Sequence, residues 1–236
     1  MTPSPDALLV LRSALAIVLA YLIGGIPWAL IIGKRFYHVD LRTVGSGNLG
    51  ATNVFRILGT DAGVAVAVLD VAKGACAVAL AGLLVPSTPS ATLHEWVLVG
   101  ATAAAMLGHS YSPYIRFSGG KGVAVAAGAL LVLMPLVWPP LLLLFIAVIA
   151  ITRYVSLGSI CAAAAFPLLV LWLYPTLPTI VFAFAGAVLV IWRHRSNIGR
   201  IRRGEESKID FKNAAQRARD AAEHARERAK DRRDGT

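Results

Sequence analysis

The sequence has little charge and few cysteines for its 236 residues. Only 15% of the residues are Asp, Glu, Lys or Arg, whereas 57% are hydrophobic and the mean hydropathy is +0.67. This composition excludes an ordinary soluble domain. The two cysteines, Cys76 and Cys161, fall inside apolar runs without metal-ligand spacing. We therefore expect two small buried hydrophobes, and neither a disulfide framework nor a metal site.

The charge that is present gathers at the C-terminal end. Residues 193–236 hold 14 of the 23 basic and 8 of the 13 acidic residues, so the first 192 residues contain only 9 basic and 5 acidic ones. A pI of about 10.1 could indicate a nucleic-acid partner. Basic residues at the ends of membrane spans explain it more simply. We expect a lipid membrane as partner, and no nucleic acid.

Seven apolar runs follow one another along the chain. A bilayer span takes about 20 residues, within a range of about 17–25, so the middle runs are short but usable. Prolines at 135, 139–140, 175 and 178 break the later runs and predict hairpin tips. The first run is too long for the apolar part of a signal peptide. The sequence predicts an all-α integral membrane protein with seven transmembrane helices, at residues 8–33, 61–85, 95–109, 122–134, 138–152, 155–174 and 177–192.

Loop charges set the orientation. If the N-terminus lies outside, every loop Lys and Arg falls in a cytoplasmic loop. The outside loops, 86–94, 135–137 and 175–176, then hold none. This asymmetry is the positive-inside pattern, so we expect a cytoplasmic C-terminus. A five-span alternative, which merges the proline-broken runs, would move some basic loops outward. The basic loop residues are Lys34, Arg35, Arg42, Arg56, Arg116, Lys121 and Arg153.

The C-terminal tail has a composition of its own. Residues 213–233 alternate Ala with Arg, Lys, Asp and Glu, which are strong helix formers and recur with opposite charge at three- and four-residue spacing. We expect a charged cytoplasmic helix attracted to an anionic leaflet, without a catalytic role. Two domains are predicted: a membrane domain at 1–206 and the charged tail at 207–236.

The first of three polar islands on the cytoplasmic side spans residues 45–53. Its three glycines permit positive φ, and successive backbone N–H groups in such turns form concave anion sites. Arg42 precedes the island and Arg56 follows it, so an anion would meet two cations. Short hydrogen-bonding side chains complete the island. Its polar and glycine residues are Gly45, Ser46, Gly47, Asn48, Gly50, Thr52 and Asn53.

The second island, at 108–122, ends at a predicted helix start. Gly119, Gly120 and Lys121 there offer free backbone N–H groups, the positive end of the helix dipole and an ammonium, which together suit a phosphate. It is not a Walker A loop, because Ile115 stands where that motif has Gly and Gly122 where it has Ser or Thr. Nucleotide hydrolysis is therefore not indicated.

The third island, at 193–206, follows the last span. A stop-transfer cluster would explain the arginines of this island, but not His194 and Asn197. These two residues are three positions apart and share one helix face. Ser156 lies on the same side of the membrane. Asp70 and Lys73, one turn apart inside the second run, are expected to pair with each other, and a single His109 at a helix end is expected to be structural. Because the three motifs lack a carboxylate cluster, these residues suit phosphates rather than a metal.

At this point the chain resembles the bacterial acyl-phosphate:glycerol-3-phosphate acyltransferases, the PlsY family. The resemblance rests on Val44–Asn53, on Gly108–Ala124 and on His194–Ile198, in order and at comparable spacing over residues 8 to about 206. Asp70–Gly74 and Arg153–Leu157 also match family patterns. Two departures are a glycine, Gly25, where the family commonly has serine, and the charged extension after about Ser207.

The resemblance implies a seven-helix enzyme of the bacterial inner (plasma) membrane, with its site facing the cytoplasm and no cofactor. It would transfer a fatty acyl group from acyl phosphate to the sn-1 hydroxyl of glycerol 3-phosphate, giving lysophosphatidic acid and inorganic phosphate. Ser46, Arg56, Lys121 and Ser156 would bind glycerol 3-phosphate. The loop of Gly47, Asn48, Gly50, Thr52 and Asn53 would cradle the donor phosphate, with Gly119 and Gly120 as a second nest, and the catalytic residues would be His194, Asn197 and Lys121.

Rival functions make different predictions. A transporter of phosphate or organophosphate anions would also place cations and glycine breaks among short helices, but it predicts inverted repeats and a site near the bilayer midplane. No repeat is visible in this sequence. An acyltransferase with a His-x4-Asp dyad is excluded because no His has Asp five residues later. A purely structural scaffold does not explain three phosphate-suited islands on one face.

Overall fold

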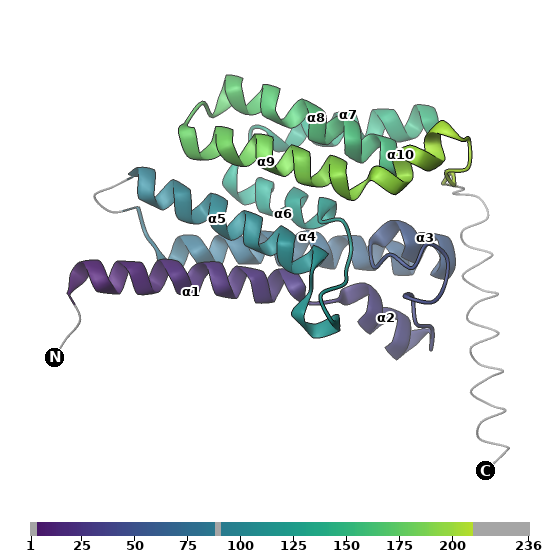
Figure 1. Ribbon diagram of the computed structural model, residues 1–236, viewed down its shortest axis with the longest axis horizontal. Helices are drawn as coiled ribbons and strands as arrows, with labels where there is room; N and C mark the ends of the chain where they lie inside the picture. Colours follow the sequence, from purple (N-terminus) through teal and green to yellow (C-terminus); the bar gives the residue numbers. More distant parts are fainter. Residues whose placement is uncertain (1–3, 88–90, 210–236) are drawn as a thin grey trace, which may run out of the picture. The chain divides into compact units, whose positions relative to one another are not determined.

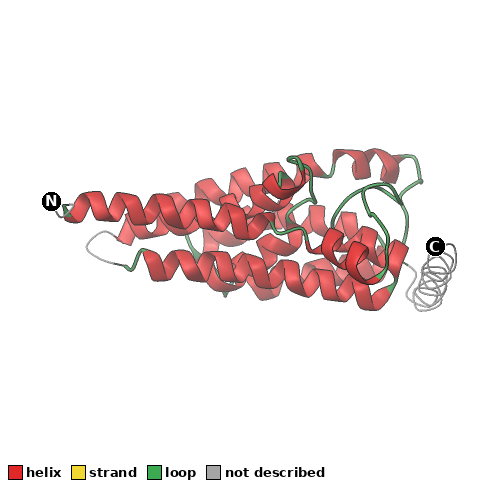
Figure 2. Cartoon of the chain, turned by 90° about the horizontal axis from the view of Figure 1, so that it is seen from below, coloured by secondary structure: helices red, strands yellow, loops and turns green. Residues whose placement is uncertain are grey.

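The computed structural model describes residues 4–87 and 91–209. Within those residues the chain is helical and has no β-strand, and one isolated bridge pairs Ser112 with Ser118 (Figure 2). The all-α prediction is confirmed. The α-helices, labelled in Figure 1, are α1 (Pro5–Gly25), α2 (Trp28–Phe36), α3 (Ala51–Leu58), α4 (Thr60–Leu84), α5 (Ala91–Ser110), α6 (Val123–Leu133), α7 (Trp138–Thr152), α8 (Val155–Leu173), α9 (Leu177–Arg193) and α10 (Arg195–Arg202). A short 3-10 helix, η1 (Pro113–Ile115), lies between α5 and α6.

Prolines set the helix boundaries, as the sequence indicates. Pro27 separates α1 from α2 within the first apolar run, because proline lacks the N–H that would continue the ladder. Pro139 and Pro178 lie in the first turns of α7 and α9, where that N–H is not needed. All seven apolar runs are therefore helical. The charged helix predicted for 213–233 lies outside the described residues.

The helices differ in whether they could cross a bilayer. Three helical segments, Asp6–Phe36, Thr60–Leu84 and Val155–Leu173, are long and apolar enough. The helices α9 and α10 meet that test only together and are bent by 54° between them, whereas α6 and α7 are shorter. The seven-span count stays a prediction, and the structure supports the coarser statement that several long apolar helices are present.

The chain divides into two compact units, which we describe separately. The first contains residues 1–26 and 70–208, and the second contains Pro27–Leu69. The helix α4 begins in the second unit and ends in the first. Of the residues singled out in the sequence, the first island lies in the second unit, and the other two islands lie in the first.

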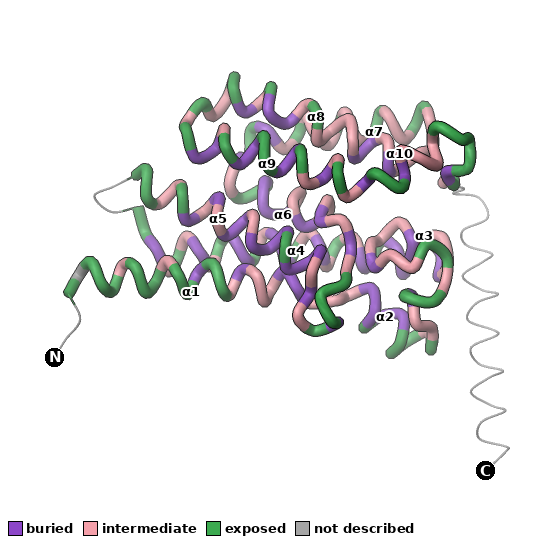
Figure 3. Tube along the Cα trace, in the orientation of Figure 1, coloured by how far each residue is buried: buried purple, intermediate pink, exposed green. Residues whose placement is uncertain are grey.

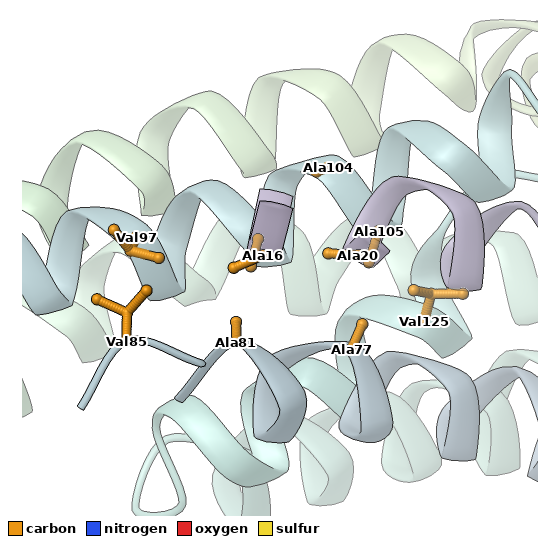
Figure 4. Close-up of a cluster of buried hydrophobic side chains, with 10 residues drawn as sticks. Ala16, Ala20, Ala77, Ala81, Val85, Val97, Ala104, Ala105 and Val125 are labelled. Atoms are coloured by element: carbon orange, nitrogen blue, oxygen red, sulfur yellow. The ribbon is translucent and has the colours of Figure 1, made fainter. Parts of the chain in front are cut away.

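Small residues let the helices of the first unit approach closely. A Cβ added to Gly24 of α1 would lie 2.2 Å from the carbonyl oxygen of Ala105, and one added to Gly108 of α5 would lie 2.1 Å from that of Tyr21. Only glycine fits such contacts between α1 and α5, which is typical of membrane helices. The buried cluster around them is also built from small side chains, most of which Figure 4 labels. Its members are Ala16, Ala20, Ala77, Ala81, Val85, Val97, Ala101, Ala104, Ala105 and Val125.

A second cluster packs α5, α6, α8 and α9 with larger side chains. The rings of Phe166 and Phe182 meet edge to face, with centroids 5.8 Å apart at 77°, an arrangement that the ring quadrupoles favour. Met134 and Val137, between α6 and α7, are fully buried against this cluster. The hairpin tip predicted between α6 and α7 is therefore packed into the core.

Large apolar side chains also cover the outer faces of the helices. Val10 of α1 is 69% exposed and Leu168 of α8 is 68% exposed, and Figure 3 shows such exposed positions along these helices. A soluble surface would carry charge at such positions, whereas a lipid-facing surface does not. Here one prediction was wrong: Cys76 is exposed and Cys161 is only partly buried. An apolar setting in a membrane helix does not require contact with protein.

Candidate active site

One asparagine holds the glycine-rich loop of the second unit. Asn53, near the start of α3, is 2% exposed. Its Oδ1 accepts the backbone N–H of Ser46 at 3.0 Å, and its Nδ2 donates to the carbonyl oxygens of Leu41 and Val44 at 3.4 and 3.3 Å. These bonds satisfy backbone groups that would otherwise lack partners. The Asn53 side chain thus organises the loop from within.

The loop turns where the sequence predicts. Gly45 and Gly47 have φ of +61° and +66°, the left-handed region that glycine adopts without strain. Asn48 Oδ1 accepts the N–H of Gly50 at 3.0 Å. Gly50 is the N-cap of α3 and no side chain caps this helix, so its first turn presents backbone N–H groups. A loop of this kind suits an anion.

Arg42 has an acidic partner that the sequence analysis did not consider. Its Nε lies 2.9 Å from Asp40 Oδ1 and its Nη2 lies 2.5 Å from Asp40 Oδ2, while Lys34 Nζ lies 3.2 Å from the same Oδ2. The hydrogen bond from Arg42 holds the pKa of Asp40 well below its usual value. Asp40 therefore stays ionised, and it competes with any phosphate for the Arg42 guanidinium.

In the first unit, Lys121 lies in the loop between α5 and α6. Arg116 and Phe117 adopt left-handed φ of 56° and 55°, and Gly122, at +79°, caps α6. Arg193, the last residue of α9, donates from Nη2 to the carbonyl oxygen of Gly120 at 2.6 Å. The end of α9 thus fixes the loop one residue before Lys121.

Lys121 reaches the third island through Asn197. Its Nζ donates to Asn197 Oδ1, and Asn197 Nδ2 donates to Glu206 Oε1 at 2.6 Å. Ser156, at the start of α8, donates from Oγ to the same Oε1 at 2.8 Å. Arg200 Nε lies 2.7 Å from Glu206 Oε2. The carboxylate of Glu206 thus joins α8 to α10, and through Asn197 it is linked to the loop that carries Lys121.

Glu206 is buried, with 8% of the residue exposed, yet it is ionised. Burial by itself raises the pKa of this carboxyl, but the hydrogen bonds from Asn197, Ser156 and Arg200 outweigh it and leave the pKa below its usual value. The carboxylate and the three cationic groups nearby, Lys121, Arg200 and Arg193, give this part of the unit an excess of positive charge. Such a surface favours anionic ligands.

His194 lies between α9 and α10 and is 3% exposed. Its Nδ1 is 2.8 Å from the carbonyl oxygen of Val190. A carbonyl can only accept, so Nδ1 carries the hydrogen. In the neutral ring Nε2 then has the lone pair, and it is the nitrogen that can accept a hydrogen bond from another group.

With this geometry established, comparison with known proteins is decisive. Residues 14–204 match the family described as Glycerol-3-phosphate acyltransferase. The chain belongs to this family. The glycerol-3-phosphate acyltransferase of Listeria welshimeri is 45% identical over 82% of this chain and 95% of its own length. That of Rippkaea orientalis is 43% identical over 85% of this chain and 94% of its own length.

Solved structures of the family share the fold. The chain is similar to a crystal structure of PlsY (YgiH), an integral membrane glycerol 3-phosphate acyltransferase, in its glycerol 3-phosphate form, with a TM-score of 0.76 and 36% identity over 84% of this chain and 96% of that one. The lysophosphatidic acid form gives a TM-score of 0.73 and 33% identity, over 86% and 98%. This acyltransferase is therefore an all-helical membrane protein of the PlsY family.

The predicted site residues of the acyltransferase are distributed over both units. The first unit brings Lys121, Ser156 and Asn197 together through Glu206, with Gly119, Gly120 and His194 on the same elements. The second unit holds Ser46, Gly47, Asn48, Gly50, Thr52, Asn53 and Arg56 in its loop and in α3. Their roles toward substrate stay predictions.

Sequence reasoning missed Glu206. Glu206 is the last residue of the third island, beyond the family motif His194–Ile198, and it was given no role; it follows a left-handed turn at Gly204 with φ of +70°. The glycine that follows α10 was the available signal of a chain reversal. In contrast, the pairing of Asp70 with Lys73 is confirmed, with Oδ1 and Nζ 2.8 Å apart.

Proposed function

We propose that this family member transfers a fatty acyl group from an acyl phosphate to the sn-1 hydroxyl of glycerol 3-phosphate, giving lysophosphatidic acid and inorganic phosphate. The observation that carries the proposal is the network in which Asn197 and Ser156 bond to Glu206 and Lys121 bonds to Asn197, because Lys121, Asn197 and Ser156 are residues of the family motifs. A buried carboxylate that orients donors and an ammonium suits the binding of a phosphate monoester.

The residues agree with the chemistry of this donor. An acyl phosphate is a mixed anhydride with a good leaving group, so positioning and charge stabilisation do most of the work. The hydroxyl oxygen of glycerol 3-phosphate forms the new ester bond, and the bond from the acyl carbon to the phosphate oxygen breaks. Lys121 and the backbone N–H groups of Gly119 and Gly120 would stabilise the charge on phosphate.

Each predicted residue receives a role in this proposal. Ser46, Arg56, Lys121 and Ser156 bind glycerol 3-phosphate. His194 and Asn197 hold and orient phosphoryl groups. The donor phosphate is cradled by the loop of Gly47, Asn48, Gly50 and Thr52, which Asn53 holds in shape through its bonds to the loop backbone.

The hydroxyl proton needs an acceptor. Glu206 is ionised, but its two oxygens already accept from Ser156, Asn197 and Arg200. We therefore assign the proton to the donor's own phosphate, which leaves as inorganic phosphate. His194 and Asn197 place that phosphate.

The proposal includes a topology. Seven helices cross the bacterial plasma membrane, with the N-terminus outside and the C-terminus in the cytoplasm. The basic loops and the three islands then face the cytoplasm, and the acyl chain enters from the inner leaflet between apolar helices.

The choice of donor is tested with the purified full-length protein. Glycerol 3-phosphate is supplied with palmitoyl phosphate or with the thioester palmitoyl-CoA, and lysophosphatidic acid is quantified. We expect product with the phosphate and none with the thioester, which lacks the leaving phosphate. Product from the thioester alone would refute the donor assignment.

A further inference from the structure

A buried polar cluster in the first unit is not used by the reaction proposed above. It consists of Asp70 and Lys73 on α4 and His109 on α5, which are 1%, 5% and 8% exposed. Charged groups inside a membrane protein are costly and call for a reason. The loop that carries Lys121 packs directly against this cluster.

The Lys73 ammonium has one ion-pair partner, Asp70, and two hydrogen-bond partners, Ile26 and His109. Its Nζ lies 2.8 Å from Asp70 Oδ1, 2.7 Å from the carbonyl oxygen of Ile26 and 3.0 Å from His109 Nδ1. An ammonium can only donate, so His109 Nδ1 must accept. The hydrogen of the neutral imidazole is therefore on Nε2, at the opposite edge of the ring.

That opposite edge faces the loop. A Cβ added to Gly120 would lie 2.0 Å from His109 Nε2, so the Gly120 backbone rests directly on the ring. The N–H of Gly120 also donates to the carbonyl oxygen of His109 at 3.1 Å. At Gly119, a Cβ would lie 2.1 Å from the same oxygen. The ring cannot rotate without displacing Gly120, which precedes Lys121, and the His109 carbonyl leaves no room for a side chain at Gly119.

Stability alone does not explain the cluster. Replacing a buried ion pair by apolar side chains of similar volume is often neutral or stabilising. The pair does, however, fix which way the His109 ring faces and which nitrogen carries the hydrogen. An aliphatic pair would fill the same space without orienting the imidazole.

We propose that Asp70, Lys73 and His109 are positioning residues that hold the Gly119–Gly120 segment, and through it Lys121, in the geometry that binds the phosphate of glycerol 3-phosphate. Asp70 orients the Lys73 ammonium, Lys73 orients the His109 ring, and the ring supports the loop from one side. Arg193 holds it from the other through Gly120. This inference rests on the proposed function, since it assigns Lys121 to that substrate.

The first test replaces the ion pair by apolar residues, in the double variant Asp70→Val/Lys73→Met of the full chain in detergent. The melting temperature should be equal to or above that of the wild type. The KM for glycerol 3-phosphate should rise by about tenfold, the loss expected for one charge-assisted contact, with the KM for palmitoyl phosphate unchanged. Amide hydrogen exchange should accelerate in residues 116–122 and not in α6.

The second test separates the two edges of the His109 ring. In His109→Gln the amide can reach the position of Nε2 beside Gly120, whereas in His109→Asn it reaches only that of Nδ1 beside Lys73. We expect the Gln variant to keep the wild-type KM for glycerol 3-phosphate within about threefold, and the Asn variant to behave like the double variant. Thr102→Val is the matched control, because this buried hydroxyl of α5 donates to the carbonyl oxygen of Leu98 in its own helix.

Several results would overturn the inference. One is a double variant whose amide exchange in residues 116–122 and whose KM for glycerol 3-phosphate are both unchanged. Another is an equal rise of this KM in His109→Gln and His109→Asn. A large fall in the melting temperature of the double variant would assign the pair to folding. If wild-type protein formed no lysophosphatidic acid from palmitoyl phosphate, the proposed donor would fail instead. The exchange data would still decide whether the cluster orders the loop.

Discussion

Asn197 donates its amide hydrogen to Glu206 across 2.6 Å while its carbonyl oxygen accepts from Lys121. The amide therefore has one orientation, because the reverse would set its NH2 group against an ammonium and its oxygen against a carboxylate. Glu206 therefore acts on the Lys121 ammonium indirectly, through the Asn197 amide. An acidic residue outside the motifs thus sets the geometry of two motif residues.

This arrangement predicts that Asn197→Asp is inactive. The new carboxylate would keep Lys121 as a partner but would face Glu206 Oε1, so a hydrogen bond to a charged group, worth about 1.5–3 kcal/mol, becomes a repulsion. We expect lysophosphatidic acid formation to fall by at least about two orders of magnitude. The control is Ser196→Ala, at the exposed preceding residue. Activity within about threefold of wild type in Asn197→Asp would contradict this role.

Glu206 should give the protein a pH-dependent stability. Its pKa in the folded state lies below the usual value of a glutamate, about 4.3 in the unfolded chain, so its contribution is complete above that value and is lost as the pH falls through the folded pKa. Thermal unfolding of the wild type and of Glu206→Gln at a series of pH values measures the difference. We expect a constant wild-type advantage above about pH 5 that shrinks toward about pH 3.

The matched control for Glu206 is Glu205→Gln. Glu205 is exposed and pairs with Arg203 on the surface, at 2.8 Å. Exposed ion pairs contribute little to stability, so this variant should unfold like the wild type at every pH. An equal effect of both substitutions would show that general surface charge, and not the buried carboxylate, is responsible.

His194→Gln tests whether a protein base takes the hydroxyl proton. If the donor phosphate accepts it, Gln can still orient a phosphoryl group through its amide, and turnover should stay within about tenfold of wild type, the value of one hydrogen bond. Asn197→Ala, measured beside it, should abolish turnover. Loss of turnover in His194→Gln with substrate binding intact would restore His194 as the base.

Asn53→Ala should loosen the glycine-rich loop of the second unit. It removes three hydrogen bonds to backbone groups, each worth about 1 kcal/mol. We expect faster amide exchange at residues 41–48 and a loss of activity of about tenfold or more. Thr43→Val is the control, because its hydroxyl donates to the carbonyl oxygen of Asp40 on the exposed side of this loop. Unchanged exchange in Asn53→Ala would show that the loop is held by other contacts.

Local rules predicted much of this acyltransferase from its sequence. Prolines follow the ends of α6 and α8 and stand in the first turns of α7 and α9, although Pro167 lies inside α8. Glycines gave the turns at Gly45 and Gly47, and one-turn spacing paired Asp70 with Lys73. Each of these depends on neighbours within a few residues. The seven apolar runs all became helices for the same reason.

The rest depends on contacts that no local rule supplies. Glu206 is 50 residues from Ser156, and they meet only because the chain reverses after α10. Asn53 belongs to a motif and was assigned to substrate from it, but its side chain binds the backbone of Leu41, Val44 and Ser46. The exposure of Cys76 was missed because lipid, rather than protein, can surround an apolar helix face.

The most direct measurement is release of inorganic phosphate from palmitoyl phosphate by the purified protein, with and without glycerol 3-phosphate, beside Lys121→Ala. The account predicts release that requires glycerol 3-phosphate, matches lysophosphatidic acid one to one and disappears in Lys121→Ala. Phosphate release without the acceptor, or full activity of Lys121→Ala, would contradict it.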